Sequence, residues 1–93
     1  MDKNKVLQTI KIYRDFLELL GVPKINFPHE LLLDDEENLL AHCYGMLDKM
    51  EQFVAENKME KVFRWLGFIQ GCLWSLGWFT LEELKNHNRP DTA

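Results

Sequence analysis

The residue types that most often carry catalytic or ligand chemistry are few in this chain and are spread along it. His29, His42 and His87 are the three histidines, and Cys43 and Cys72 are the two cysteines. His42 and Cys43 are neighbours, but adjacent side chains on a helix diverge by about 100°, so this imidazole is badly placed to act as a base for this thiol. The sequence also has no glycine-rich phosphate loop, no paired-cysteine zinc spacing and no His-Glu-x-x-His helix. We therefore expect a protein that is not an enzyme and that uses no metal or cofactor.

A stripe of small residues is the strongest candidate for a binding surface. Gly67, Gly71 and Ser75 recur every four residues, so on a helix they lie on one side. The absence of bulk lets another helix or a flat ligand approach the backbone closely. In the simpler interpretation the first helix of the same chain fills this stripe and Gln70 is hydrogen-bonded internally. In the functional interpretation the stripe is a groove for a partner or ligand.

The aromatic residues favour a surface for association. Six of the eleven lie within the seventeen residues 63–79, which is more than a three-helix core can easily hide. Exposed aromatic patches mark association sites, where Trp and Arg often dominate the binding energy. The sequence therefore predicts a homo-oligomer or a partner-binding surface built on this segment. The candidate contact residues are Arg64, Trp65, Phe68, Gln70, Gly71, Trp74 and Trp78.

A second group of candidate residues lies near the C-terminal end and indicates a different class of function. Lys85, His87, Asn88 and Arg89 supply groups that hold phosphate, while Trp74 or Trp78 offers a face on which a base stacks. This combination suits a protein that sequesters a nucleotide second messenger, such as a cyclic nucleotide. The alternative is an ordinary solvated helix end, where cations offset the helix dipole.

The charge distribution argues against nucleic acid as the partner. The net charge is −4, and residues 1–33, 34–60 and 61–93 carry +1, −6 and +1. The acidic run Asp34 to Glu37 stands just before an apolar period, where carboxylates favour a helix start. A charge mimic of nucleic acid is the other interpretation of that acidic segment. DNA binding by the last short helix is a third hypothesis for function, although the chain lacks a basic recognition surface.

Hydrophobic periodicity predicts an all-α fold. Apolar residues recur at helical spacing over 3–20, about 35–56 and about 58–76, and a short helix is expected from 81 to about 87. Gly21 is the expected stop of the first helix, and Pro28 can open a short turn through Leu33. Asn57 with Glu60, and Thr80 with Glu83, have capping-box spacing. We expect one domain over 1–93, a small helical bundle of three main helices plus one or two short ones.

The remaining alternative to exclude is a membrane protein. Trp65 to Leu81 is seventeen residues without a charge, at the lower limit for a spanning helix. Gln70, Ser75 and Gly77 interrupt this run, and the earlier helices are amphipathic, so we expect no span. The chain also begins without the apolar segment of a signal peptide. Unpaired cysteines in a reducing cytoplasm are the expected setting.

About a third of the chain resembles a known group of proteins. The stretch runs from Arg64-Trp65-Leu66-Gly67-Phe68-Ile69-Gln70-Gly71 through Leu73-Trp74, Gly77, Thr80 and Glu83-Leu84-Lys85 to His87-Asn88-Arg89-Pro90. It is similar to a family of short, mostly uncharacterised proteins of tailed bacteriophages. The resemblance implies a phage accessory protein, made in a bacterial cytoplasm, that binds a host component stoichiometrically. Inhibition of a host antiviral defence is a frequent role of such proteins, so the leading hypothesis is a non-enzymatic inhibitor of a bacterial protein.

Overall fold

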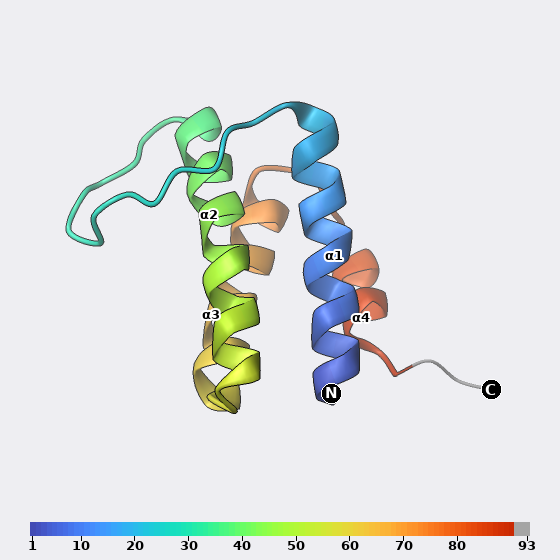
Figure 1. Ribbon diagram of the computed structural model, residues 1–93. Helices are drawn as coiled ribbons and strands as arrows, with labels where there is room; N and C mark the ends of the chain where they lie inside the picture. Colours follow the sequence, from blue (N-terminus) through green and yellow to red (C-terminus); the bar gives the residue numbers. More distant parts are fainter. Residues whose placement is uncertain (91–93) are drawn as a thin grey trace.

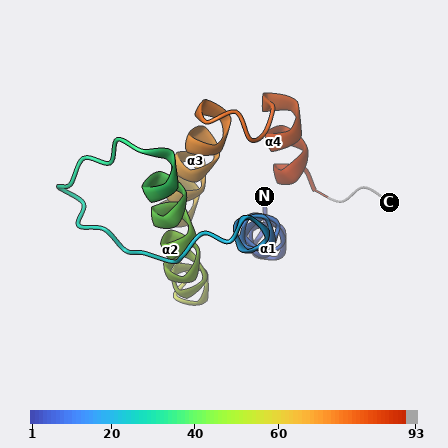
Figure 2. The ribbon, with the colours of Figure 1, turned by 90° about the horizontal axis from the view of Figure 1, so that it is seen from above.

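Four helices make up the described part of the chain, which is residues 1–90 of a computed structural model (Figure 1). They are α1 (Lys3–Leu20), α2 (Glu36–Ala55), α3 (Met59–Ser75) and α4 (Leu81–Asn88), and residues 1–90 contain no strand. Successive helices run in alternating directions, and α4 lies beside α1 (Figures 1 and 2). The predicted all-α bundle of three main helices is confirmed, with one short helix after them.

The core is formed where α2 packs against both α1 and α3. Tyr13, Leu47 and Ile69 come from these three helices and are each 0% exposed. Burying an apolar side chain of this size contributes roughly 1.5–3 kcal/mol, so this shared interior is the main source of stability. The helices therefore form one unit around a common core.

Three of the four helices end in the same way, because a residue with positive φ follows the last turn. Gly21 has φ 75°, Asn57 has φ 61° and Gly77 has φ 82°. After each of them the next amide donates back into the helix, as when the Trp78 N–H reaches the Leu73 carbonyl oxygen at 2.9 Å. This pattern is the Schellman motif. Gly21 ends α1 as predicted.

The start of α3 differs from the prediction. Asn57 forms no capping box with Glu60, since Lys58 is the residue that precedes the helix and no side-chain cap bond is present. Asn57 instead takes the left-handed conformation that closes the tight connection between α2 and α3. The expected hairpin forms, but Asn57 acts on the end of α2 rather than on the start of α3.

The connection between α1 and α2 is a long arch that projects from the helices (Figure 2). The Ile25 N–H donates to the Ala41 carbonyl oxygen at 3.2 Å, which fixes the first part of the arch against α2. Gly45 allows this close approach, because a Cβ atom there would lie 2.7 Å from the Ile25 carbonyl oxygen. Beyond it, the Leu31 N–H donates to the Pro28 carbonyl oxygen at 3.1 Å, so the predicted turn opens at Pro28 but closes at Leu31 rather than continuing to Leu33.

The last helix is fixed by its cap and by contacts with α1. The Thr80 side chain accepts from the Glu83 N–H, and the Glu83 carboxylate accepts from the Thr80 N–H, so the predicted capping box is present. Leu84 enters the core, and the Thr9 hydroxyl donates to the His87 carbonyl oxygen at 2.9 Å. Among residues 1–90, no helix has both the length and the hydropathy that crossing a bilayer requires.

Candidate functional site

The two sides of α3 have opposite environments. Leu66, Ile69 and Leu73 face the core and are at most 2% exposed. On the other side, Phe68 and Trp74 are each 51% exposed, although they are large and apolar. Exposed apolar patches mark interaction sites, so the outward side of α3 is the candidate binding surface.

The surface between Phe68 and Trp74 is recessed, because the exposed residues there include two glycines. A Cβ atom added at Gly67 or Gly71 would meet no other atom within 4 Å, and both residues are exposed. Helix α1 therefore does not fill the small-residue stripe, and that part of the simpler interpretation is wrong. The packing reason is that α1 lies against α2 and α4, where Leu17 and Thr9 are buried, and leaves the far side of α3 open.

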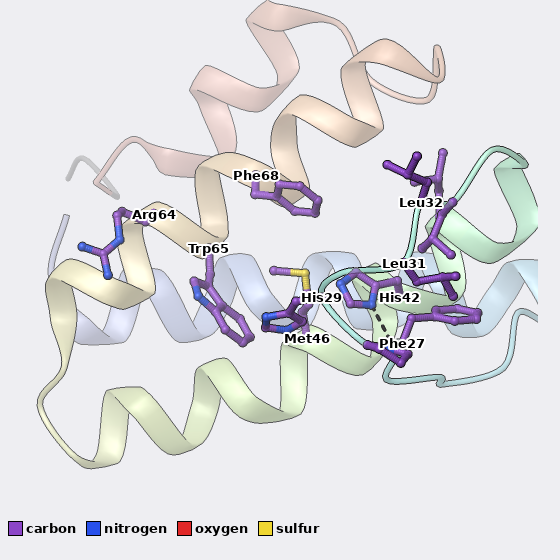
Figure 3. Close-up of a pocket in the computed structure, with 12 residues that line it drawn as sticks. Phe27, His29, Leu31, Leu32, His42, Met46, Arg64, Trp65 and Phe68 are labelled. Carbon is purple, nitrogen blue, oxygen red and sulfur yellow. Dashed lines mark hydrogen bonds between the residues drawn. The ribbon is translucent and has the colours of Figure 1, made fainter.

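Three adjoining hollows follow this side of α3. The first, of about 410 Å³, lies between the arch, α2 and α3 (Figure 3). The second, of about 540 Å³, shares Leu39 and Phe68 with the first and has Gly67, Gly71 and Ser75 in its lining. The third, of about 230 Å³, shares Gly71 and Trp74 with the second and reaches α4. We call the first hollow the loop pocket and the three together the α3 groove.

The loop pocket has mostly apolar walls. Leu31 and Leu32 on the arch are 51% and 93% exposed, and they lie opposite Phe68 of α3 (Figure 3). Its volume is within the range of small-molecule and side-chain sites, roughly 300–1,000 Å³. The complete lining is Phe27, Pro28, His29, Leu31, Leu32, Leu33, Leu39, His42, Met46, Arg64, Trp65 and Phe68.

Two histidines supply the polar groups beside these apolar walls. His42 Nδ1 accepts a hydrogen bond from the Phe27 N–H at 3.4 Å, which holds the arch to α2 (Figure 3). The His29 ring meets the His42 ring edge-on, with centroids 6.2 Å apart. Burial, followed by the charges of His29 and Lys49, lowers the pKa of His42 below its ordinary value. His42 is therefore a neutral acceptor at neutral pH.

Arg64 and Trp65 flank the pocket at the N-terminal end of α3. The Arg64 guanidinium pairs with Glu60 at 3.2 Å and points away from the two imidazoles (Figure 3). Trp65 is half-buried, its ring meets that of Phe53 edge-on at 5.0 Å, and Lys61 lies over it at 5.7 Å. Trp65 therefore forms a wall of the pocket, while Arg64 provides a cation at its rim.

Gln70 is half-buried at the edge of the third hollow and makes three hydrogen bonds within the chain. Its amide nitrogen donates to the Tyr13 hydroxyl at 2.9 Å and to Asn88 Oδ1 at 2.7 Å. The Asn88 amide nitrogen donates back to Gln70 Oε1 at 3.1 Å. Burial raises the pKa of Tyr13 to about 12, against the opposing effect of the Gln70 hydrogen bond. The internal bonding of Gln70 expected in the simpler interpretation is confirmed.

His87 belongs to the same internal network. The Tyr13 hydroxyl lies 2.9 Å from His87 Nδ1, and the His87 ring meets Tyr13 and Phe79 at 5.4 and 5.1 Å between centroids. Burial lowers the pKa of His87, and nearby Lys5 adds to this effect while Glu83 opposes it. The ring is therefore a neutral acceptor that joins α4 to α1. We call Tyr13, Gln70, His87 and Asn88 the polar network.

The other two predicted phosphate-holding residues remain at the surface. Lys85 is exposed and lines the third hollow. Arg89 pairs with Glu82 at 3.4 Å and donates to Asn86 Oδ1 at 2.6 Å. The structure thus brings only Lys85 and Asn88 to the same hollow, where Asn88 is already bonded to Gln70. His87 is bonded inside the chain, and Arg89 is paired at the surface.

Trp78, the last predicted contact residue, lies beyond the groove. Its ring meets that of Phe16 edge-on at 5.3 Å, and its indole N–H donates to Glu36 Oε1 at 2.8 Å. It is 38% exposed and lines none of the three hollows. Its contacts connect the α3–α4 turn with α1 and with the start of α2.

Sequence reasoning missed the part of the site that the arch provides. Leu31, Leu32 and Leu33 were available as a signal, since they form an apolar run outside any helical period. Gly45 gave a second signal, because a glycine within an amphipathic helix often marks a close backbone approach. Among residues 1–90, no group of three or more His, Cys, Asp or Glu side chains is placed to hold a metal ion.

Comparison of the chain with protein-family models, curated proteins and solved structures gives no match. The candidate site is therefore defined by the geometry of the chain itself. That geometry is a continuous apolar depression over α3, with His29 and His42 at one end and Lys85 at the other.

Proposed function

We propose that this chain is a non-enzymatic binding protein that holds one partner protein in the α3 groove. The observation that carries the proposal is the open groove floor at Gly67 and Gly71, bordered by the half-exposed Phe68 and Trp74. Large aromatic side chains beside a concave surface are typical of residues that dominate protein association. The partner would cover apolar area that the chain leaves in water.

The shape of the groove favours an apolar helix as the bound element. A helix presents side chains three and four residues apart along one side, and such anchors fit a groove with separate hollows. The glycine floor allows its backbone to come close, while the loop pocket takes the largest anchor. Residues 65–81 carry no charge, whereas Arg64 and Lys85 lie at the two ends of the groove. Acidic residues on either side of an apolar stretch would complement these cations.

The target class comes from the phage resemblance. On this proposal the chain inhibits a bacterial host protein, for example one of an antiviral defence system, by stoichiometric binding. Burial of an inhibitory partner surface requires no catalytic group on this chain, and the edge-on rings of His29 and His42 are suited to lining a contact. An apolar, net acidic protein also fits a protein target better than a phosphate backbone.

The nucleotide hypothesis receives less support from the geometry. Asn88 and His87 are bonded to Gln70 and Tyr13, so binding a phosphate would require breaking an internal network. Lys85 remains available to a ligand in the third hollow, beside the Trp74 ring. The experiment below therefore includes the release of small molecules as a separate outcome.

Affinity capture from a bacterial lysate tests the proposal when it is paired with matched variants. Gly71→Arg fills the groove floor, whereas Leu19→Arg places the same side chain on α1, at a residue that is 86% exposed. We expect the wild-type chain and Leu19→Arg to retain the same protein, and Gly71→Arg to lose it. Titration calorimetry with that purified protein should then give one partner per chain, and the activity of the partner should fall in parallel.

Three outcomes would contradict the proposal. They are no protein retained by the wild-type chain, equal retention by both arginine variants, and a nucleotide as the only heat-released component. Circular dichroism of both variants shows whether each retains its helices, so a loss of binding can be separated from a loss of folding.

A second copy of the chain is the competing occupant of the groove, because the aromatic count also predicts a homo-oligomer. Light scattering at increasing concentration distinguishes the two cases. A dimer that Gly71→Arg converts to a monomer, while Leu19→Arg does not, would assign the groove to self-association rather than to a different protein.

A further inference from the structure

The two cysteines face each other across the α2–α3 hairpin. Cys43 on α2 and Cys72 on α3 lie nearly the same number of residues from Asn57, where the chain turns back. Cys72 packs against the core cluster to which Cys43 belongs, and both are free thiols. The fold has therefore brought the two thiols of the chain together.

The two sulfur atoms differ in their access to solvent. Cys43 is 1% exposed and belongs to the core cluster. Cys72 is half-buried and lines the second hollow of the α3 groove, beside the open floor at Gly71. A small reagent can therefore reach Cys72 through the groove, whereas Cys43 is enclosed in the core.

The pKa values of the two thiols also shift in opposite directions. The hydrogen bond from the Cys43 thiol lowers the pKa of Cys72, although burial opposes this effect. The same contact and the burial of Cys43 raise the pKa of that thiol. Because the thiolate is the nucleophilic form, Cys72 is the more reactive member at neutral pH.

We propose that Cys43 and Cys72 form a peroxide-sensitive dithiol in which Cys72 is oxidised first and Cys43 completes an intramolecular disulfide. The proposal goes beyond the binding function and applies to the chain with an open groove, because a partner seated in the α3 groove would cover Cys72. It assigns a modification site to Cys72 in the groove lining and to Cys43 in the core behind it.

The chemistry balances with hydrogen peroxide as the oxidant. The Cys72 thiolate attacks one peroxide oxygen, the O–O bond breaks, and Cys72 becomes a sulfenic acid while the released hydroxide takes up a proton to give water. The Cys43 sulfur then attacks the Cys72 sulfur, so that an S–S bond forms and the S–O bond breaks. The Cys43 proton leaves with that hydroxyl as a second water. Two thiols lose two electrons, and one peroxide is reduced to two waters.

The location of Cys43 makes it the resolving thiol. An S–S bond of about 2.05 Å requires the two sulfurs to move from contact into bonding distance. Cys43 is already beside Cys72, whereas a thiol of another chain would have to enter the groove. An intramolecular bond is therefore favoured over a disulfide-linked dimer.

The test uses the reduced, full-length protein and equimolar hydrogen peroxide. We expect the intact mass to fall by two hydrogen atoms, with a peptide map joining Cys43 to Cys72 and no covalent dimer. Before oxidation, iodoacetamide at neutral pH should modify Cys72 at least about tenfold faster than Cys43, as access and thiolate character both require.

Two variants assign the roles of the cysteines. Cys43→Ala should leave Cys72 as a sulfenic acid that dimedone traps, and Cys72→Ala should leave Cys43 reduced. The wild-type measurement does not depend on how these variants fold. The proposal is overturned if both wild-type thiols remain free after peroxide, if Cys43 is alkylated first, or if oxidation yields linked dimers instead.

Discussion

Polar and apolar side chains of α3 have opposite environments on its two sides. Toward α1 and α4, Gln70 is polar and half-buried, and its amide is hydrogen-bonded to Tyr13 and Asn88. On the outer face, Phe68 and Trp74 are apolar and half in water, with the open floor at Gly71 between them. Gln70 therefore serves the stability of the fold, while Phe68 and Trp74 are available for association.

This contrast reverses the usual expectation about which side chains are functional. Amides and imidazoles attract attention as ligand-binding groups, but a buried polar group costs stability unless it is paired. Gln70, His87 and Asn88 meet that requirement through one another and through Tyr13. Phe68 and Trp74 need no such partner within the chain, and half of each side chain remains in water. If the contrast is correct, substitutions on the two faces will separate stability from binding.

The largest effect is expected from two adjacent residues on opposite faces. Ile69 is 0% exposed, so Ile69→Ala should lower the free energy of unfolding by about 3 kcal/mol through a cavity in the core. Phe68→Ala should cost less than about 1 kcal/mol, because half of that ring is already in water. Urea unfolding measures both values, and partner capture should be lost only in Phe68→Ala. Similar stability losses in the two variants would contradict the contrast.

The next effect tests the polar network. Gln70→Ala leaves the Tyr13 hydroxyl and the Asn88 amide without their partner, so the free energy of unfolding should fall by about 2 kcal/mol. Gln52→Ala is the matched control, since Gln52 is exposed and makes only a 3.4 Å contact with Glu56. Its cost should be under about 0.5 kcal/mol. Loss of nucleotide or partner binding in a folded Gln70→Ala variant would show that Gln70 also contacts a ligand.

Two glycines should respond to alanine with opposite signs. Gly71→Ala should raise the free energy of unfolding by about 0.8 kcal/mol, because alanine favours helix and its Cβ meets open space. Gly45→Ala should lower it by about 1–2 kcal/mol, because the new Cβ would press on the Ile25 backbone. Thermal unfolding of the two variants checks both signs. A destabilised Gly71→Ala variant would mean that the groove floor is covered in solution.

The smallest effect is a dependence of stability on pH. Burial lowers the pKa values of His42 and His87 in the folded state below their ordinary 6.5, so just below that pH the unfolded chain binds more protons. The free energy of unfolding should therefore fall as the pH falls from neutral to about 5.5, before carboxylates titrate. His87→Gln should reduce this slope. NMR titration should place both imidazole midpoints below 6.5, and midpoints at or above this value would contradict the buried, neutral state.

Most of the fold was predictable because it follows from local sequence signals. The apolar periods give α1, α2 and α3 within one or two residues, and Thr80 with Glu83 gives the cap of α4. Asn57 was wrongly assigned because capping and left-handed turns favour the same residue type, so its backbone angle is decided by the hairpin. The turn after Pro28 likewise depends on how the arch lies across α2.

The site was predictable only in part, because it depends on which helix covers which face. The aromatic count predicts that some rings of residues 63–79 are exposed, but not which ones. That Phe68 and Trp74 are among them depends on the side that α1 leaves open, which is a tertiary property. Gln70 and His87 come together from positions far apart in the sequence, so their pairing has no local signal. The contribution of Leu31 and Leu32 is of the same kind, since the position of the arch decides whether these leucines form a wall.

The attachment of the arch has a consequence for how the loop pocket admits a ligand. One end of the arch is fastened at Ala41 and Gly45, and the other leads directly into the first turn of α2. Both attachments lie on α2, so one helix holds the two ends of the segment 28–35. An anchor that enters the loop pocket therefore lies between α3 and a wall that α2 alone carries at both ends.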